Sequence, residues 1–230
     1  VTTDGRKIGL DQRLINLRLP DAKESKVNAC MENIYKIWND TKKESLTQAV
    51  FCDFSTPKKG SLKKFNVYDD IKWKLVQKGI PEKEIAFVHD YETDLQKKEL
   101  FTKVRSGQVR IVFGSTQKMG VGTNVQNRAV ALYHLDCPWR PSDIAQREGR
   151  ILRQGNQNPE IGIVRFVTER SFDSYMWQGV ERKATFIAQL MRGNLDSREI
   201  EEIDSSALSA AEAKAISSGN PLLLEHSTVH

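Results

Sequence analysis

The sequence predicts an α/β fold, in which helices flank a doubly wound, mainly parallel sheet and a helical extension follows at the C-terminus. Five short apolar runs alternate along the chain with segments whose apolar residues recur at helical spacing. Such an alternation of strand and helix is typical of parallel sheets that are covered on both faces and joined by right-handed crossovers.

Each apolar run ends in polar, glycine or proline residues, which bound a strand. The five predicted strands cover residues 49–54, 85–88, 109–113, 129–135 and 161–167. Helices are expected over residues 25–40, over 68–75 before Gly79 and Pro81, and from a capping box at 93–96 to near Gly107. Pro141 is well placed to start another helix, and a last one is expected to extend to Lys183.

Changes in composition divide the chain into three segments. Residues 1–24 form a polar lead-in, residues 25–193 carry the alternating pattern, and residues 194–230 turn to acidic and small residues, with one short helix. Because the chain begins at Val1 rather than at a methionine, we expect it to be a piece of a longer protein.

Composition narrows the class of protein. Charged residues make up 28% and hydrophobic residues 39% of the 230 residues, which excludes a membrane protein and a wholly disordered chain. The net charge of +5 permits a polyanionic partner without requiring one. Three cysteines stand without metal-ligand spacing, so we predict no metal site and expect reduced thiols in a cytoplasmic protein that contacts no membrane.

Hydroxyl and glycine residues follow two of the predicted strands. Ser55 and Thr56 come after the first strand, whereas Ser115 and Thr116 come after the third and lead into a glycine-containing loop over residues 117–124. Ligands of doubly wound sheets collect at the carboxyl ends of the strands. Such a loop serves equally well to bind phosphate or only to turn the chain.

Residues 146–155 read QREGRILRQG and carry two arginines three residues apart. Arg150 and Arg153 are predicted to share one face of a helical turn, behind Gln146 and Gly149. Because a guanidinium group stays charged and presents a planar fork of donors, a converging pair suits a phosphoryl-transfer site. The alternative is a solvated basic helix.

The chain lacks the other half of such a site. No stretch has the spacing Gly-x-x-x-x-Gly-Lys followed by Ser or Thr, and no Asp-Glu pair follows a strand to hold magnesium. We therefore expect this chain alone to hydrolyse no ATP.

Together these stretches resemble the motifs of superfamily 2 helicases of the Swi/Snf type. Residues 115–124 and 136–155 resemble motifs V and VI, residues 51–56 resemble motif IV, and residues 166–183 resemble the segment that braces the lobe. The likeness covers roughly residues 25–193. The sequence of these stretches is also similar to that of large helicase and adenine-methyltransferase proteins of phages and mobile elements. Met119 departs from the pattern, because motif V usually has a glycine there.

The resemblance implies the second of two RecA-like lobes, with ATP and Mg²⁺ held mainly by the first. It implies that Arg150 and Arg153 act as arginine fingers and that Gln146 and Gly149 shape their turn. Thr116 would couple the nucleotide to the nucleic-acid backbone. The remaining implied contacts are to the nucleotide from Gly120, Gly122 and Asn124, and to nucleic-acid phosphates from Ser55, Thr56, Ser115 and Thr116.

The implied partners are DNA, as a duplex in the Swi/Snf type, and the preceding lobe of the same polypeptide. The mobile-element likeness adds a fused methyltransferase domain in a bacterial or phage-infected cell. The alternative is a non-enzymatic module that binds nucleic acid or protein on the same fold. Two convergent arginines favour the motor, since a binding module does not need them.

Overall fold

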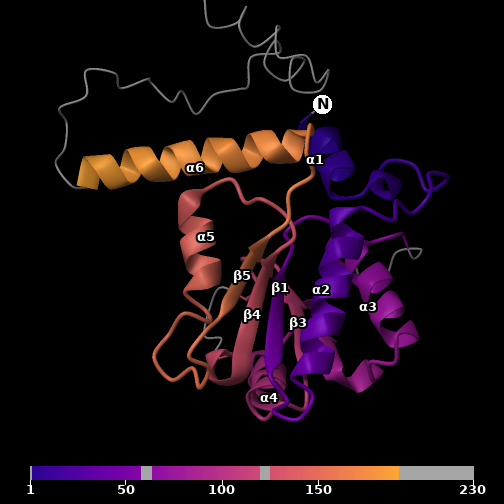
Figure 1. Cartoon of the computed structure of the whole chain (residues 1–230), viewed down its shortest axis with the longest axis vertical. Coiled ribbons are helices and arrows are strands. Elements are labelled where there is room, and N and C mark those ends of the chain that lie inside the picture. Colours follow the sequence, from indigo (N-terminus) through magenta and orange to yellow (C-terminus); the bar gives the residue numbers. More distant parts are fainter. Residues whose placement is uncertain (1, 58–63, 120–124, 192–230) are drawn as a thin grey trace, which may run out of the picture.

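Five parallel strands form one sheet in the order β2-β3-β1-β4-β5 (Figure 1). The structure, a computed structural model, describes residues 2–57, 64–119 and 125–191. The predicted α/β fold with a parallel sheet is confirmed, and every strand pair is parallel. The strands are β1 Thr47–Phe51, β2 Ile85–Phe87, β3 Ile111–Gly114, β4 Ala129–His134 and β5 Gly162–Arg165.

Helices cover both faces of this sheet, as the term doubly wound implies. Side chains alternate along the strands, so that Val50 faces one apolar cluster and Phe51 faces another. The first cluster packs under α2 and α3, and the second packs under α4 and includes Ile151, in the turn after α5. The helices are α1 Thr2–Leu10, α2 Lys26–Asp40, α3 Val67–Gln77, α4 Asp94–Arg105, α5 Pro141–Glu148 and α6 Phe172–Met191.

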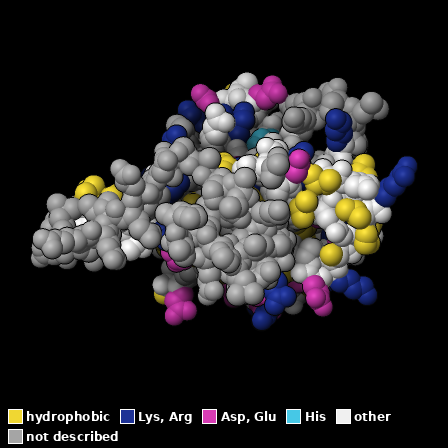
Figure 2. Space-filling model, turned by 90° about the horizontal axis from the view of Figure 1, so that it is seen from above, with side chains coloured by type: hydrophobic (Ala, Val, Ile, Leu, Met, Phe, Trp, Pro, Cys, Tyr) yellow, Lys and Arg dark blue, Asp and Glu magenta, His cyan; other side chains and the backbone are white. Residues whose placement is uncertain are grey.

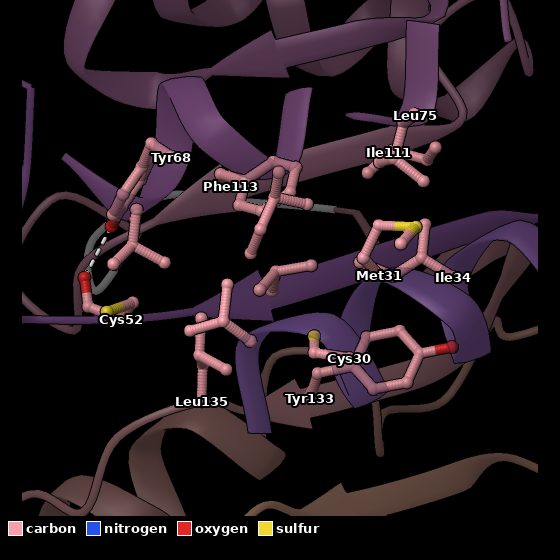
Figure 3. Close-up of a cluster of buried hydrophobic side chains, with 14 of the residues drawn as sticks. Cys30, Met31, Ile34, Cys52, Tyr68, Leu75, Ile111, Phe113, Tyr133 and Leu135 are labelled. Atoms are coloured by element: carbon pink, nitrogen blue, oxygen red, sulfur yellow. Dashed lines mark hydrogen bonds between the residues drawn. The ribbon is translucent and has the colours of Figure 1, made fainter. Parts of the chain in front are cut away.

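The first cluster holds the largest share of the buried apolar side chains (Figure 3). Cys30 and Ile34 of α2 lie against Tyr133 of β4, and all three are fully buried. The Tyr68 hydroxyl of α3 donates a hydrogen bond to the carbonyl oxygen of Cys52, immediately after β1. This bond ties α3 to the carboxyl end of the central strand, where the candidate site begins.

The predicted capping box at Thr93 is confirmed. Its side chain accepts from the backbone N–H of Gln96, and the Gln96 side chain accepts in return from the backbone N–H of Thr93. Several strands end before the predicted apolar run does, although Cys52, Val88 and Leu135, just beyond the ends of β1, β2 and β4, are still buried. The last helix, α6, continues beyond Lys183 to Met191.

Residues 1–24 contain more structure than a lead-in. Helix α1 packs against α6, where Gly5 and Gly9 allow close approach. A Cβ added at Gly5 would come within 3.1 Å of Phe172, and one at Gly9 would come within 3.1 Å of Asp173. The polar sequence does not reveal this helix, because the helix is buried only by contact with α6, which lies far along the chain.

Both signs of charge appear on the described part of the face seen from above. Lysine and arginine side chains stand at separate places around the outline, with acidic side chains between them (Figure 2). We therefore argue a nucleic-acid role from particular loops. Within the described part of the chain, no helix has the length and apolar character needed to cross a membrane.

Candidate functional site

Three loops meet at the carboxyl edge of the sheet, because the strands before them are neighbours in register. Phe51 of β1 is paired with Gly114 of β3 on one side and with His134 of β4 on the other. The chain therefore delivers Asp53, Thr116 and Asp136, two residues after each of these positions, to one place.

Arg147 of α5 lies at the centre of these loops, and its side chain is fully buried. Its Nε donates to Thr116 Oγ1 at 2.8 Å, and its Nη2 donates to Asp53 Oδ2 at 2.7 Å and to Asp136 Oδ1 at 3.0 Å. Its Nη1 donates to the Asp136 carbonyl oxygen at 2.9 Å and lies 3.3 Å from His134 Nδ1. These contacts engage all five N–H donors of the guanidinium group.

The opposite charges of this cluster stabilise one another. Burial works to lower the pKa of Arg147, but Asp136 and Asp53 more than offset it and raise that pKa above its ordinary value. Burial likewise works to raise the pKa of Asp53, but Arg147 and the hydrogen bonds from Thr116 hold it below 3.8. About a third of the Asp53 side chain is exposed, so water weakens its attraction more than that of Asp136.

Asp136 also shapes the loop after β1. Its Oδ2 accepts from the backbone N–H groups of Asp53 and Phe54, at 2.7 and 2.8 Å. The next residue, Ser55, adopts a left-handed conformation with φ of 63°, and its hydroxyl oxygen accepts from the backbone N–H of Val67. A non-glycine residue held in this region is characteristic of functional loops. Thr56 follows, half-buried in the same loop.

The cluster continues through His134 to the outer strand. Arg147 has only donors, so His134 Nδ1 accepts, and the ring hydrogen lies on Nε2, which contacts Glu148 Oε1 at 3.2 Å. Burial lowers the pKa of His134, which makes this contact a hydrogen bond from a neutral ring and not an ion pair. Glu148 Oε1 also accepts from Arg165 Nη2 of β5 at 3.0 Å.

Acidification is expected to destabilise the fold through His134. Its folded pKa lies below 6.5, so the stability it contributes is present above pH 6.5 and lost as pH falls through the folded value. His89, whose pKa burial also lowers, acts in the same direction. Urea unfolding at pH 7 and pH 5 is expected to show a decline that is smaller in His134→Gln. An undiminished decline in that variant would refute the assignment.

The arginine motif does not form one helical face, and that prediction is wrong. Helix α5 ends at Glu148, and Arg150 and Arg153 follow in turns. The helix ends here because glycine, at position 149, has a low helix propensity, and because Ile151 packs into the second core cluster. Arg150 is half-buried and Arg153 is exposed. Burial, together with the nearby Arg153, lowers the pKa of Arg150.

The other predicted site residues lie on or next to α5, in the loop after β3, or outside the described residues. Gln146 is exposed on α5, Gly149 caps that helix, and the buried Ser115 accepts a hydrogen bond from the backbone N–H of Lys118. Gly120, Gly122 and Asn124 lie outside the described residues. Thr116 uses its hydroxyl within the protein, where it donates to Asp53 Oδ2 and accepts from Arg147.

Met119 fits where the motif usually has glycine. Its side chain is fully buried in the second core cluster and lies against Gly114. A Cβ added at Gly114 would come within 2.3 Å of the Met119 sulfur, so the glycine in β3 leaves the space that the methionine fills. The Met119 side chain therefore points into the core and away from the outer surface of the loop.

Sequence reasoning missed Arg147 and Asp53 as site residues. An arginine is almost never fully buried unless it is paired, so composition alone argues against it. A signal was present, because Arg147 lies three residues after Ile144 and four before Ile151, on the apolar side of α5. No group of three or more His, Cys, Asp or Glu side chains in the described part is arranged to hold a metal ion.

Known proteins share parts of this chain. A stretch of 90 residues is 33% identical to Defense against restriction protein B of Escherichia phage P1, and covers 39% of this chain and 4% of that protein. The chain thus spans a small part of that relative's length.

Two solved structures are similar to this chain. The C-terminal part of the Fun30 ATPase domain superposes with a TM-score of 0.54 at 17% identity, covering 94% of this chain and 59% of that one, which shows the RecA-like fold. S. cerevisiae Dbp5 bound to RNA and ADP BeF3 gives a TM-score of 0.48 at 15% identity, covering 68% and 35%. Residues 27–155, more than half of the chain, match the family described as helicase conserved C-terminal domain, and the chain belongs to that family.

Proposed function

We propose that this chain is the C-terminal motor lobe of an ATP-dependent DNA helicase or translocase. In this proposal Arg150 and Arg153 reach the phosphates of ATP, which a preceding RecA-like lobe mainly holds together with Mg²⁺. The observation that carries it is the arginine turn itself. Arg150 and Arg153 lie in the turns that follow α5, and the Arg150 N–H donates to the backbone carbonyl oxygen of the fully buried Arg147 at 3.1 Å. Two guanidinium groups presented after an anchored helix suit the negative charge of a transferring phosphoryl group.

The nucleic-acid contacts are proposed for the loops at the carboxyl edge. Ser55 and Thr56 stand in the loop that Asp136 shapes, and the left-handed backbone at Ser55 fixes how that loop is presented. Ser115 stands in the neighbouring loop after β3, whereas Thr116 beside it is left out of these contacts because its hydroxyl and N–H groups already bond to Asp53 and Arg147. Hydroxyl and backbone N–H groups at such positions suit phosphate oxygens and set register without reading sequence.

Duplex DNA is the proposed track, because the motif wording is similar to the Swi/Snf type. The likeness to a phage protein fits an origin in a phage or mobile element and a place in the cytoplasm of a bacterial cell. A fused adenine-methyltransferase domain is part of the same proposal. In this proposal the complete protein is this chain joined to its preceding lobe.

The chain alone is expected to show no ATP turnover, because it has no phosphate loop and no Asp-Glu pair after a strand. The complete protein is expected to hydrolyse ATP with Mg²⁺ and to do so faster when duplex DNA is added. A phosphate-release assay with and without DNA measures both. Robust metal-dependent turnover by the chain alone would overturn the division of labour. DNA binding without stimulated turnover would favour the non-enzymatic alternative.

A further inference from the structure

Arg147 connects the loop after β3 to the turn that carries Arg150. Its side chain ends on Thr116 and Asp53, in the loops after β3 and β1. Its backbone carbonyl oxygen accepts from the Arg150 N–H at 3.1 Å. A single residue therefore contacts the candidate nucleic-acid loops with its side chain and the arginine turn with its main chain.

Arg150 stands between two buried anchors. Arg147 precedes it by three residues, and Ile151, fully buried in the second core cluster, follows it directly. Backbone bonds from Ile151 and Leu152 to the Glu148 carbonyl oxygen, at 3.1 and 2.9 Å, close the turn. Ile151 holds one end of the turn against the sheet. Any remaining change in the position of Arg150 therefore follows the position of Arg147.

The Thr116 hydroxyl, at a half-buried position, joins Arg147 to Asp53. It is held between an acceptor, Asp53 Oδ2 at 2.8 Å, and a donor, Arg147 Nε at 2.8 Å. The Thr116 N–H also donates to Asp53. Movement of the loop after β3 must therefore either move Arg147 or break a charge-assisted hydrogen bond, and the second costs free energy in a buried setting.

We propose that Arg147 is a positioning residue that sets Arg150 according to the position of the loops bearing Thr116 and Asp53. This inference rests on the proposed function for its catalytic consequence, though not for its structural one. Arg147 itself is fully buried and touches neither nucleotide nor DNA. Its effect is on the rate of the chemical step through Arg150, and not on the affinity for either ligand.

Two substitutions test the connection without removing the buried positive charge. Arg147→Lys keeps the charge that balances Asp53 and Asp136, but its single ammonium group cannot reproduce the planar fork. Thr116→Val removes the acceptor of Arg147 Nε while keeping the size of the side chain. Thr116→Ser retains the hydroxyl and is the matched control.

In the complete protein, kcat is measured at saturating duplex DNA, along with KM for ATP and Kd for DNA. Arg147→Lys and Thr116→Val are expected to lower kcat about tenfold, the loss of one charge-assisted hydrogen bond. KM and Kd are expected to stay within about twofold, because an interaction made only in the transition state changes kcat alone. Thr116→Ser is expected to stay near the wild-type kcat.

Hydrogen exchange on this chain alone gives a readout that needs no catalysis. The amides of Arg150 and Leu152 are expected to exchange faster in both substitutions than in the wild type and in Thr116→Ser, while those of β2 are unchanged. Unchanged exchange at Arg150, or a wild-type kcat in both Arg147→Lys and Thr116→Val, would overturn the positioning role. A wild-type complete protein without DNA-stimulated turnover would instead defeat the proposed function, and the exchange measurement would still decide the role of Arg147.

Discussion

Arg150→Ala is expected to lower the ATP turnover of the complete protein about 10³- to 10⁵-fold, which is what an arginine finger contributes to phosphoryl transfer. The physical reason is charge. Negative charge spreads over the oxygens of the transferring group, and a guanidinium group held close to it needs no reorganisation when the reaction occurs. Arg153→Ala is expected to cause a large loss as well, though the exposed Arg153 is held less firmly than the half-buried Arg150.

The measurement is steady-state phosphate release at saturating ATP and DNA. Arg182→Ala, on the exposed side of α6, is the matched control because it removes the same charge far from the turn, and we expect wild-type turnover from it. Near-normal turnover in both Arg150→Ala and Arg153→Ala would remove their proposed role. Arg150→Lys separates charge from shape, because lysine supplies the charge without the fork.

Arg147→Met is expected to lower the free energy of unfolding by about 3 to 5 kcal/mol. Methionine fills the apolar part of the space, but it leaves Asp53 and Asp136 facing each other with no positive partner. It also removes donors from Thr116 Oγ1 and from the Asp136 carbonyl oxygen. Unsatisfied acceptors and unpaired charges are costly in a buried site, so the effect is much larger than that of an ordinary surface arginine.

Urea unfolding of this chain at pH 7 measures the loss, with Arg182→Met as the control for an exposed arginine. A deficit of less than about 1 kcal/mol would show that the cluster tolerates the loss of its cation. The pH dependence adds a second check. Arg147 holds the pKa of Asp53 below 3.8, so that part of the stability is present above the unfolded pKa and lost as pH falls through the folded one. The difference between wild type and Arg147→Met is therefore expected to shrink in acid.

Local signals in the sequence predicted the fold well. Strands such as β1 are short apolar runs whose alternate residues enter different clusters, and the capping box at Thr93 is a pattern of neighbours in the chain. These features depend on residues close in sequence. Helix α1 was missed because Gly5 and Gly9 lower helix propensity, and their benefit appears only when α6 packs against them.

The placement of the candidate residues follows from the ends of the strands, whereas the contacts among their side chains do not. The hydroxyl residues do lie after the carboxyl ends of β1 and β3. The arginine motif does begin on α5, as expected. The arrangement around Arg147 could not be read in the same way, because it joins residues 94 positions apart in the chain, as in the contact with Asp53. Thr116 was expected to contact nucleic acid, but its hydroxyl group forms hydrogen bonds with Asp53 and Arg147.

Arg150 is proposed to act on the transferring phosphate and not on the bound nucleotide as such. Titration of the complete protein with ADP alone, and with ADP plus aluminium fluoride as a transition-state analogue, tests it most directly. In Arg150→Ala the affinity for ADP is expected to remain within about twofold of the wild type, whereas the affinity for the analogue falls by about 100-fold or more. Equal affinity of the wild type and Arg150→Ala for the analogue would contradict the account.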